Sequence, residues 1–272
     1  MKSIFQEKAR VLNNTRMGAA YGRISLQCSL RYLSAKPGQF VTVHTDNAAG
    51  PLLRRPFSIH RLISKKHDIV WLEILYKIVG PGTEQLARLR PGDRVDILGP
   101  LGNGFTMEDG LKRVVLAGGG IGIAPLLFLA SALHTMEKGP AETTLFAGGR
   151  SESDLLCLDE FTDLGMIVHI STDDGSAGEK GLLTRPLEAA IQEQRPDMIY
   201  ACGPMGMLTC VADIAKKQAV PCQVSIETIM ACGMGACLGC AIEGASPDAE
   251  YLHVCLDGPV FDARRLSRQP GI

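Results

Sequence analysis

Four cysteines near the end of the chain have the residue type and spacing of a metal-cluster site. They form a C-x4-C-x2-C-x14-C pattern at Cys232, Cys237, Cys240 and Cys255. The first three match the loop spacing of plant-type [2Fe–2S] centres, and the glycines between them let the backbone approach the sulfurs closely. The pattern predicts one [2Fe–2S] cluster with two thiolates on each iron, the fourth thiolate coming from a returning strand near residues 251–256.

A structural zinc site with four cysteine ligands is the alternative for this tail. Such sites usually combine two C-x2-C-type knuckles, which the glycine-rich run fits less well. The chain has nine cysteines, an odd number that a full disulfide framework cannot account for. Four of them lack partners at ligand spacing and are expected to be small buried residues, namely Cys28, Cys157, Cys210 and Cys222.

A second chemical motif, Arg55-Pro56-Phe57-Ser58, lies in the first third of the chain. An arginine can donate two hydrogen bonds to a pyrophosphate, an aromatic ring can pack on a flavin, and a serine can hydrogen-bond to the flavin edge. By itself the tetrapeptide fits a surface arginine at a strand turn equally well. Downstream residues support the flavin interpretation, the last two because they begin a short helix with free N–H groups; they are Leu75, Tyr76, Lys77, Gly82 and Thr83.

A glycine turn in the middle of the chain suits a dinucleotide. Residues 118–125 read GGGIGIAP, follow a predicted strand and precede a predicted helix, which is the context of a phosphate-binding turn. The register differs from the usual G-x-G-x-x-G, so the motif alone is weak evidence. Its candidate cofactor contacts are Gly119, Gly120 and Gly122.

These motifs fall into three segments of different composition. Residues 1–102 have short apolar stretches and Pro-Gly turns, which predict a small antiparallel barrel. Residues 103–220 alternate strands with helices, which predicts a mostly parallel sheet, and residues 221–272 are rich in glycine and cysteine. The predicted fold is a multi-domain β plus α/β protein: an N-terminal antiparallel flavin-binding β-barrel, a parallel-sheet nicotinamide-binding domain and a small C-terminal [2Fe–2S] domain.

Charge and hydropathy exclude two classes of partner. Twenty-eight Lys and Arg residues balance 29 Asp and Glu residues, so no basic excess exists to bind nucleic acid. Residues 114–133 carry no charge and have the length of a membrane span, but their glycines and Pro125 favour a strand, a turn and a helix. The N-terminus lacks the apolar region of a signal peptide, so we expect a cytoplasmic protein whose thiols stay reduced.

In their order along the chain, the motifs resemble the ferredoxin–NADP reductase superfamily and, within it, the electron-transfer subunits of type B dihydroorotate dehydrogenases. The likeness covers R-P-F-S, L-Y-K, G-T, GGGIGIAP, C-G-P and the four-cysteine tail. The superfamily has tyrosine where this chain has Phe57, and often arginine in place of Lys77. The resemblance implies that Gly203 and Pro204 contact the cofactor, and that Cys202 lies near the nicotinamide. A buried thiol at the end of a strand is the alternative for Cys202.

The resemblance also implies the cofactors and the partner. It implies FAD, one [2Fe–2S] cluster and NAD+ as electron acceptor, with an FMN-containing catalytic subunit in a heterotetramer of two of each chain. Electrons would pass from the partner's FMN through the cluster and FAD to NAD+, during oxidation of dihydroorotate to orotate in pyrimidine biosynthesis. We find no residue in this chain to deprotonate dihydroorotate and expect that base on the partner. Preference for NAD over NADP rests on the family, and Arg150 is one candidate to contact a 2′-phosphate.

Two other functions remain open at this point. Related FAD and [2Fe–2S] subunits serve hydrogenases and NADPH-dependent glutamate synthase, which keeps the cofactors and changes the partner. A zinc-stabilised binding module without redox activity belongs to a different class. A visible spectrum distinguishes the zinc module, and a co-purifying FMN partner that forms orotate distinguishes the other subunits.

Overall fold

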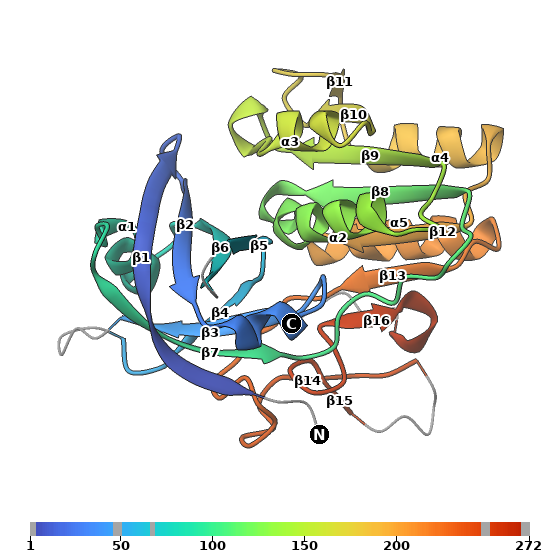
Figure 1. The fold of residues 1–272 in the computed structure, drawn as a ribbon. Coiled ribbons are helices and arrows are strands. Elements are labelled where there is room, and N and C mark those ends of the chain that lie inside the picture. Colours follow the sequence, from blue (N-terminus) through green and yellow to red (C-terminus); the bar gives the residue numbers. More distant parts are fainter. Residues whose placement is uncertain (1–3, 46–50, 66–68, 246–250, 268–272) are drawn as a thin grey trace.

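The computed structural model describes residues 4–45, 51–65, 69–245 and 251–267. They form two seven-stranded sheets and a small two-stranded one. In Figure 1 the N-terminal sheet and the α/β sheet lie side by side, and the C-terminal tail returns beneath the barrel. Within the described residues, no helix is long and apolar enough to cross a membrane.

The N-terminal half is a curled antiparallel sheet, as predicted. Its strands follow the order β4-β3-β7-β1-β2-β6-β5, and each neighbouring pair is antiparallel. Alternating side chains of the central strands fill a core that contains Ile24, Leu72 and Ile97. The elements are β1 (Phe5–Met17), β2 (Tyr21–Cys28), η1 (Leu30–Ser34), β3 (Phe40–His44), β4 (Arg55–Ser58), β5 (Arg61–Lys65), β6 (Ile69–Lys77), α1 (Pro81–Arg88) and β7 (Arg94–Leu101).

The second sheet is parallel except for one edge strand. Its order is β11-β10-β9-β8-β12-β13-β16, and only β16 runs antiparallel to its neighbour. Helices α2 and α3 pack in one core, while α4 and α5 pack in another that includes the start of the tail. The elements up to residue 217 are β8 (Arg113–Gly119), η2 (Gly120–Gly122), α2 (Ile123–Thr135), β9 (Glu142–Gly149), η3 (Glu152–Asp154), α3 (Leu158–Asp163), β10 (Ile167–Thr172), β11 (Glu179–Lys180), α4 (Thr184–Glu193), β12 (Met198–Cys202) and α5 (Met205–Lys217).

The parallel sheet continues beyond residue 220, where the sequence suggests a domain boundary. β13 (Cys222–Ser225) pairs with β12, and β16 (Val260–Asp262) pairs with β13. The tail therefore begins and ends as part of the α/β sheet, and only the loop between these strands stands apart. The sequence does not reveal this because strands of three or four residues show too little periodicity.

The loop between β13 and β16 carries the small third sheet, β14 (Ala241–Ile242) with β15 (Leu252–His253). The predicted returning strand near residues 251–256 is shorter than expected. Backbone N–H groups of Leu256 and Asp257 donate to the carbonyl of His253 at 2.9 and 2.8 Å, which closes a turn directly after β15. Cys255 therefore lies in this turn and not on the strand. A short 3-10 helix, η4 (Ala263–Arg265), follows β16.

Candidate functional site

The structure brings the four predicted ligand cysteines together as two pairs. Cys240 and Cys255 are each 3% exposed, and their Sγ atoms lie 3.2 Å apart. The other two lie nearer the surface: the exposed Cys237 donates its backbone N–H to Sγ of Cys232 at 3.4 Å. One pair is therefore packed into the core, and the other lies toward solvent.

This pairing suits two bridged irons better than a single zinc ion. Four sulfurs bound to one tetrahedral zinc at about 2.3 Å would all lie within about 4 Å of one another. Among the described residues, one group of three or more ligand atoms lies within 4.8 Å, and it contains none of these cysteines. Two separate thiol pairs are what two sulfide-bridged irons require, with two thiolates on each.

The backbone between the first and third cysteines has a geometry that wraps a cluster. Gly233 and Gly235 have φ of +70° and +86°, a region that glycine adopts without steric cost. Backbone N–H groups of Met234 and Cys237 donate to Sγ of Cys232 at 3.5 and 3.4 Å. Burial raises the pKa of the Cys232 thiol, but these donors outweigh it and lower the pKa to about 6. The loop thus favours the thiolate form, which binds metal.

The cysteine loop lies directly on the barrel. A Cβ atom on Gly233 would lie only 2.8 Å from Cγ2 of Thr42, on β3, so the loop backbone is in close contact with that strand. Asn103, just after β7, donates from Nδ2 to the carbonyls of Leu256 and Asp257 at 2.9 Å each. These contacts fix the cysteines relative to the barrel.

The predicted flavin motif forms β4, the edge strand next to β3. Pro56 pairs with Thr42 across the two strands, and all four residues of β4 are half-buried. Arg55 and Gly82 line the same shallow groove, and a Cβ on Gly82 would lie 3.6 Å from Cγ of Arg55. The structure thus brings the arginine to the first turn of α1, as a pyrophosphate site requires.

Three other residues predicted to bind the flavin have side chains that pack in the core or cap a helix. Tyr76 is 1% exposed, and its hydroxyl donates to Oδ1 of Asn14 at 2.9 Å. Leu75 is 2% exposed and packs with the α2 core. The hydroxyl of Thr83 caps α1 by accepting from the N–H of Gly80 at 3.1 Å. These side chains therefore pack within the protein, and the cofactor contacts of the three residues remain predictions for their backbone atoms, such as the N–H of Thr83 in the first turn of α1.

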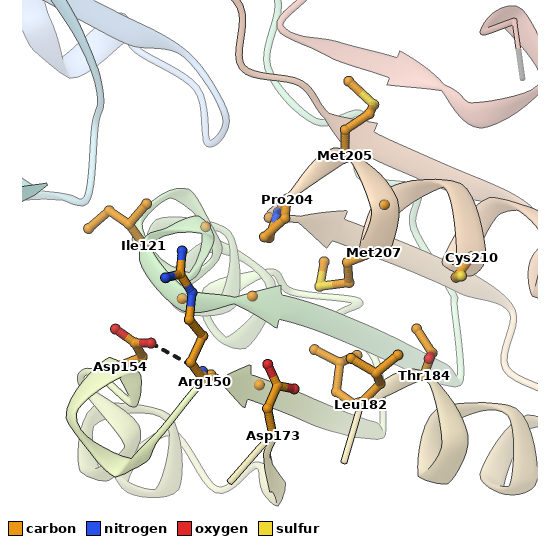
Figure 2. Close-up of a pocket in the computed structure, with 18 of the residues that line it drawn as sticks. Ile121, Arg150, Asp154, Asp173, Leu182, Thr184, Pro204, Met205, Met207 and Cys210 are labelled. Atoms are coloured by element: carbon orange, nitrogen blue, oxygen red, sulfur yellow. Dashed lines mark hydrogen bonds between the residues drawn. The ribbon is translucent and has the colours of Figure 1, made fainter. Parts of the chain in front are cut away.

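A cavity of about 700 Å³ lies where the two halves of the chain meet. Most of the predicted nicotinamide residues line it, and the predicted flavin residue Lys77 joins them there. In Figure 2, Arg150, Asp154 and Asp173 lie on one side of this cavity, and Pro204 and Met207 lie across from them. The residues from the motifs that line it are Gly119, Gly120, Gly122, Gly203 and Pro204.

Several cavity residues belong to none of the sequence motifs. Tyr21 on β2 donates its hydroxyl to Oδ1 of Asp154 at 2.5 Å, and this bond holds the pKa of Asp154 below its usual value. Asp154 also accepts from the backbone N–H of Arg150 at 3.1 Å, the dashed line of Figure 2. Glu227 also lines the cavity. The protein around its carboxyl group shields it from water, and this desolvation raises its pKa. These residues come from separate segments, so no local pattern marks them.

Two cysteines depart from expectation. Cys202 is 2% exposed and is not one of the described residues that line the cavity. Burial raises the pKa of its thiol, and it is its carbonyl that approaches Gly122. The expectation that Cys210 is buried is wrong, because this residue of α5 is exposed and lines the cavity.

Two family models match the chain. One is described as the iron-sulfur cluster binding domain of dihydroorotate dehydrogenase B and matches residues 227–267, which include all four paired cysteines. The other is described as an oxidoreductase NAD-binding domain and matches residues 116–213, which include the glycine turn and the C-G-P segment. Both domain types predicted from motif spacing are confirmed, and the zinc-binding module is not supported.

Solved structures share the fold. A structure of an NADH-dependent reduced ferredoxin-NADP oxidoreductase, reported in connection with flavin-based electron bifurcation, is 28% identical. It superposes with a TM-score of 0.82 over 95% of this chain and 89% of its own. The cytochrome b5 reductase domain of Ulva prolifera nitrate reductase is 18% identical, with a TM-score of 0.64 over 79% of this chain and 94% of its own. The second likeness concerns the fold alone.

Curated relatives match along nearly the whole chain. The dihydroorotate dehydrogenase B (NAD(+)) electron transfer subunit of Caldanaerobacter subterraneus subsp. tengcongensis is 40% identical over 260 residues, which is 95% of this chain and 97% of that protein. The subunit of the same name from Enterococcus faecalis is 37% identical over 96% of this chain and 98% of its own. The chain belongs to the family of dihydroorotate dehydrogenase B (NAD(+)) electron transfer subunits.

Proposed function

We propose that this chain holds FAD on the barrel, a [2Fe–2S] cluster at the four paired cysteines and NAD+ in the cavity. In this role it passes electrons from the FMN of a dihydroorotate-oxidising catalytic subunit to NAD+, in de novo pyrimidine synthesis. When bound, the flavin and the cluster supply the conversion between one-electron transfer and two-electron hydride chemistry. The side chains of this chain bind, orient and space these groups.

The observation that carries the proposal is the arrangement around β3. Gly233 of the cysteine loop contacts Thr42, and Thr42 pairs with Pro56 of the flavin motif. Neighbouring strands lie about 4.8 Å apart, so a single strand separates the two proposed cofactor sites. This short separation supports direct electron transfer between them.

On the flavin side, Arg55 is the residue proposed to bind the pyrophosphate. It lies beside Gly82 in the shallow groove, and its Nη1 donates at 2.8 Å to the carbonyl of Leu53, which orients the guanidinium. Phe57 packs edge-on against Tyr76 with ring centroids 6.2 Å apart, so its ring orientation is set before any ligand binds. Ser58 is half-buried at the end of the same strand and is proposed to hydrogen-bond to the flavin edge.

On the nucleotide side, the glycine turn and the start of α2 are proposed to bind the NAD+ pyrophosphate. Gly122 is the N-cap of this 13-residue helix, so the free N–H groups of the first turn open onto the cavity. Gly203 and Pro204 border the cavity on the other side of the turn and are proposed to contact the nicotinamide. Arg150 and Asp173 line the part where the sugars would lie.

The proposed docking surface for the catalytic subunit is the region around the outer cysteine pair. Exposed apolar side chains gather in this part of the tail, although such groups are normally few on a surface without a partner. Met234, Leu238 and Leu256 are 42%, 55% and 49% exposed. We propose a heterotetramer of two such chains and two FMN-containing catalytic subunits. We also propose a cytoplasmic location, because cytosolic conditions keep cysteine thiols reduced and thus available to bind a cluster.

The decisive experiment is anaerobic co-purification of this chain with its catalytic subunit. Iron, acid-labile sulfide, FAD and FMN are measured on the complex, followed by NAD+-dependent formation of orotate from dihydroorotate. The proposal expects two irons, two sulfides and one FAD for each copy of this chain, and orotate formation only with the partner present. A complex that holds these cofactors but forms no orotate would favour another partner, and a colourless protein with zinc would refute the redox assignment.

A further inference from the structure

A polar cluster joins the two halves of the molecule beside the cavity, apart from every residue assigned above. Its centre is Glu160 on α3. Arg23 on β2 donates from Nη2 to Oε1 of Glu160 at 2.6 Å, and Arg61 on β5 donates to Oε2. The three side chains are only 21–29% exposed. One carboxylate of the α/β half is thus held by two guanidinium groups of the barrel.

Further groups of the barrel support these arginines. Glu73 on β6 lies 3.9 Å from Arg61 and accepts from the hydroxyl of Ser25 at 2.8 Å. His60 is fully buried, and its Nδ1 lies 2.8 Å from the carbonyl of Ala124 at the start of α2. Burial lowers the pKa of His60 to about 4, so the ring is neutral near pH 7. It donates to that carbonyl as a second link between the halves.

The cluster resembles a metal site only by residue type. Ligand atoms of His60, Cys157 and Glu160 lie within 4.8 Å of one another. Both oxygens of Glu160 already accept from arginines, and burial raises the pKa of Cys157 to about 12, so its thiol stays protonated. The cluster has no net charge, because its two arginines balance its two glutamates and its histidine and thiol are neutral. A divalent cation would have to enter against two adjacent guanidinium groups, so the cluster is complete without one.

Strand β2 and the segment that leads to Glu160 also form a wall of the cavity, through Tyr21 and Asp154. Tyr21 and Arg23 are two residues apart on β2, so their side chains leave the same face of the strand. Tyr21 bonds to Asp154 at 2.5 Å and Arg23 bonds to Glu160 at 2.6 Å. Between these two acids, Cys157 adopts a left-handed φ of +58°, which is uncommon for a non-glycine residue. The segment from 154 to 160 is therefore attached to β2 at both ends.

We propose that Glu160 is a positioning residue that holds the nicotinamide-binding half at the correct distance and angle from the flavin-binding barrel. The inference rests on the proposed function, because it assumes that the cavity receives NAD(H) and the barrel holds FAD. Glu160 contacts neither ligand. It acts through Arg23 and Arg61, which keep the wall of Tyr21 and Asp154 in place.

The test is Glu160→Gln in the complete complex, with Glu188→Gln as the matched control. Glu188 pairs with Lys217 at 2.8 Å within the α/β half, so its loss removes an ion pair without touching the junction. NADH oxidation with an artificial acceptor is measured for both variants. Displacements near 1 Å can cost about 100-fold in rate, so we expect the kcat of E160Q to fall at least tenfold while its KM changes less than threefold. E188Q keeps both constants.

Two readouts separate positioning from a merely structural contribution. The long-wavelength absorbance that reports contact between nicotinamide and flavin weakens in E160Q, while its FAD and iron contents stay equal to those of the parent. Hydrogen exchange speeds up at residues 21–28 and 152–163 in E160Q, and residues 232–240 are unchanged. A variant that loses thermal stability but keeps kcat and this absorbance would overturn the proposal.

Two further outcomes are distinguishable. If zinc alone, added to the parent complex, binds stoichiometrically and does so only with Glu160 present, the cluster is a metal site and the proposal is wrong. If the parent complex shows no NADH oxidation, the proposed function fails. The hydrogen-exchange comparison would still decide whether Glu160 joins the two halves.

Discussion

Replacement of Gly122 by alanine tests the contact on which the nucleotide cavity depends. Gly122 has an ordinary helical backbone, with φ of −61° and ψ of −12°, so alanine introduces no torsional strain. Space is the limit. A Cβ atom at this position would lie 2.3 Å from the carbonyl oxygen of Cys202 and 2.6 Å from Cα of Gly203. All of these neighbours are backbone, which no change of rotamer can move.

The size of the effect follows from these distances. Ordinary van der Waals contact begins at 3.4 Å, so the shortest distance falls 1.1 Å short (3.4 − 2.3), and the glycine turn must separate from the C-G-P segment by about 1 Å. Overpacking of this kind costs about 1–3 kcal/mol of folding free energy. The same displacement changes the width of the cavity between Gly122 and Gly203, so we expect the dissociation constant for NADH to rise at least tenfold.

The assay combines NADH titration, followed by flavin fluorescence, with thermal unfolding. Gly206→Ala is the control for stability alone, because beyond its chain neighbours and the backbone of its own helix no atom lies within 4 Å of its Cβ position. It is the second residue of α5, and alanine favours a helix over glycine by up to about 1 kcal/mol. FAD and iron contents of Gly122→Ala are expected to match the parent, since both sites lie elsewhere. Unchanged NADH affinity in a folded Gly122→Ala variant would show that NAD(H) does not bind between this turn and the C-G-P segment.

Three other changes have defined outcomes. Cys232→Ala is expected to abolish the cluster absorbance and destabilise the tail, since metal binding there contributes folding energy, while NADH oxidation with a two-electron acceptor survives. Loss of that activity in a folded variant would contradict the proposed order of transfer. Cys210→Ala, outside the cysteine loop, is the control for the cluster absorbance alone. Arg55→Ala is expected to lower FAD retention on gel filtration, and unchanged flavin content would place the pyrophosphate elsewhere. His60 has a folded pKa of about 4 against an ordinary 6.5, so the unfolded chain binds an extra proton between these values. The free energy of unfolding, measured in urea, should therefore fall by up to about 3 kcal/mol as pH drops from 6.5 to 4. His60→Gln should reduce this pH dependence, and His134→Gln, at an exposed position, should leave it unchanged. A pH dependence that His60→Gln does not alter would refute the assignment.

Local spacing was sufficient to predict the parts of the site that lie within one turn. The three cysteines from Cys232 to Cys240 lie in one short loop and the glycines of residues 118–122 in another, and each loop is proposed to bind one small ligand group. A loop that must fit such a group has a restricted geometry, and therefore a recognisable residue spacing. The order of the β, α/β and cysteine-rich segments was predictable for a similar reason, because a change of hydrophobic periodicity is visible along the chain.

Contacts between distant segments were not predictable in the same way. Tyr76 was predicted to bind the flavin, but the motif does not show that period-2 alternation on β6 places its ring in the barrel core and Leu75 on the opposite face. β13 and β16 are too short to be recognised, and they join the parallel sheet only because the tail folds back. Asp154 and Glu160 look like ordinary surface acids in the sequence, and their partners lie 133 and 137 residues away.

The two junctions between the barrel and the rest of the molecule differ in how they are built. The cysteine loop meets the barrel by close backbone approach at Gly233 and by the two hydrogen bonds from Asn103. Such contacts leave little freedom, as suits two resident cofactors that must stay at one distance. The cavity junction relies instead on side-chain contacts: the ion pairs at Glu160, the hydroxyl of Tyr21 and the ring of His60. Each of these contacts depends on a few side-chain atoms, so the loss of one carboxylate, as in Glu160→Gln, is expected to disturb this junction and to leave the backbone contacts of the cysteine loop unchanged.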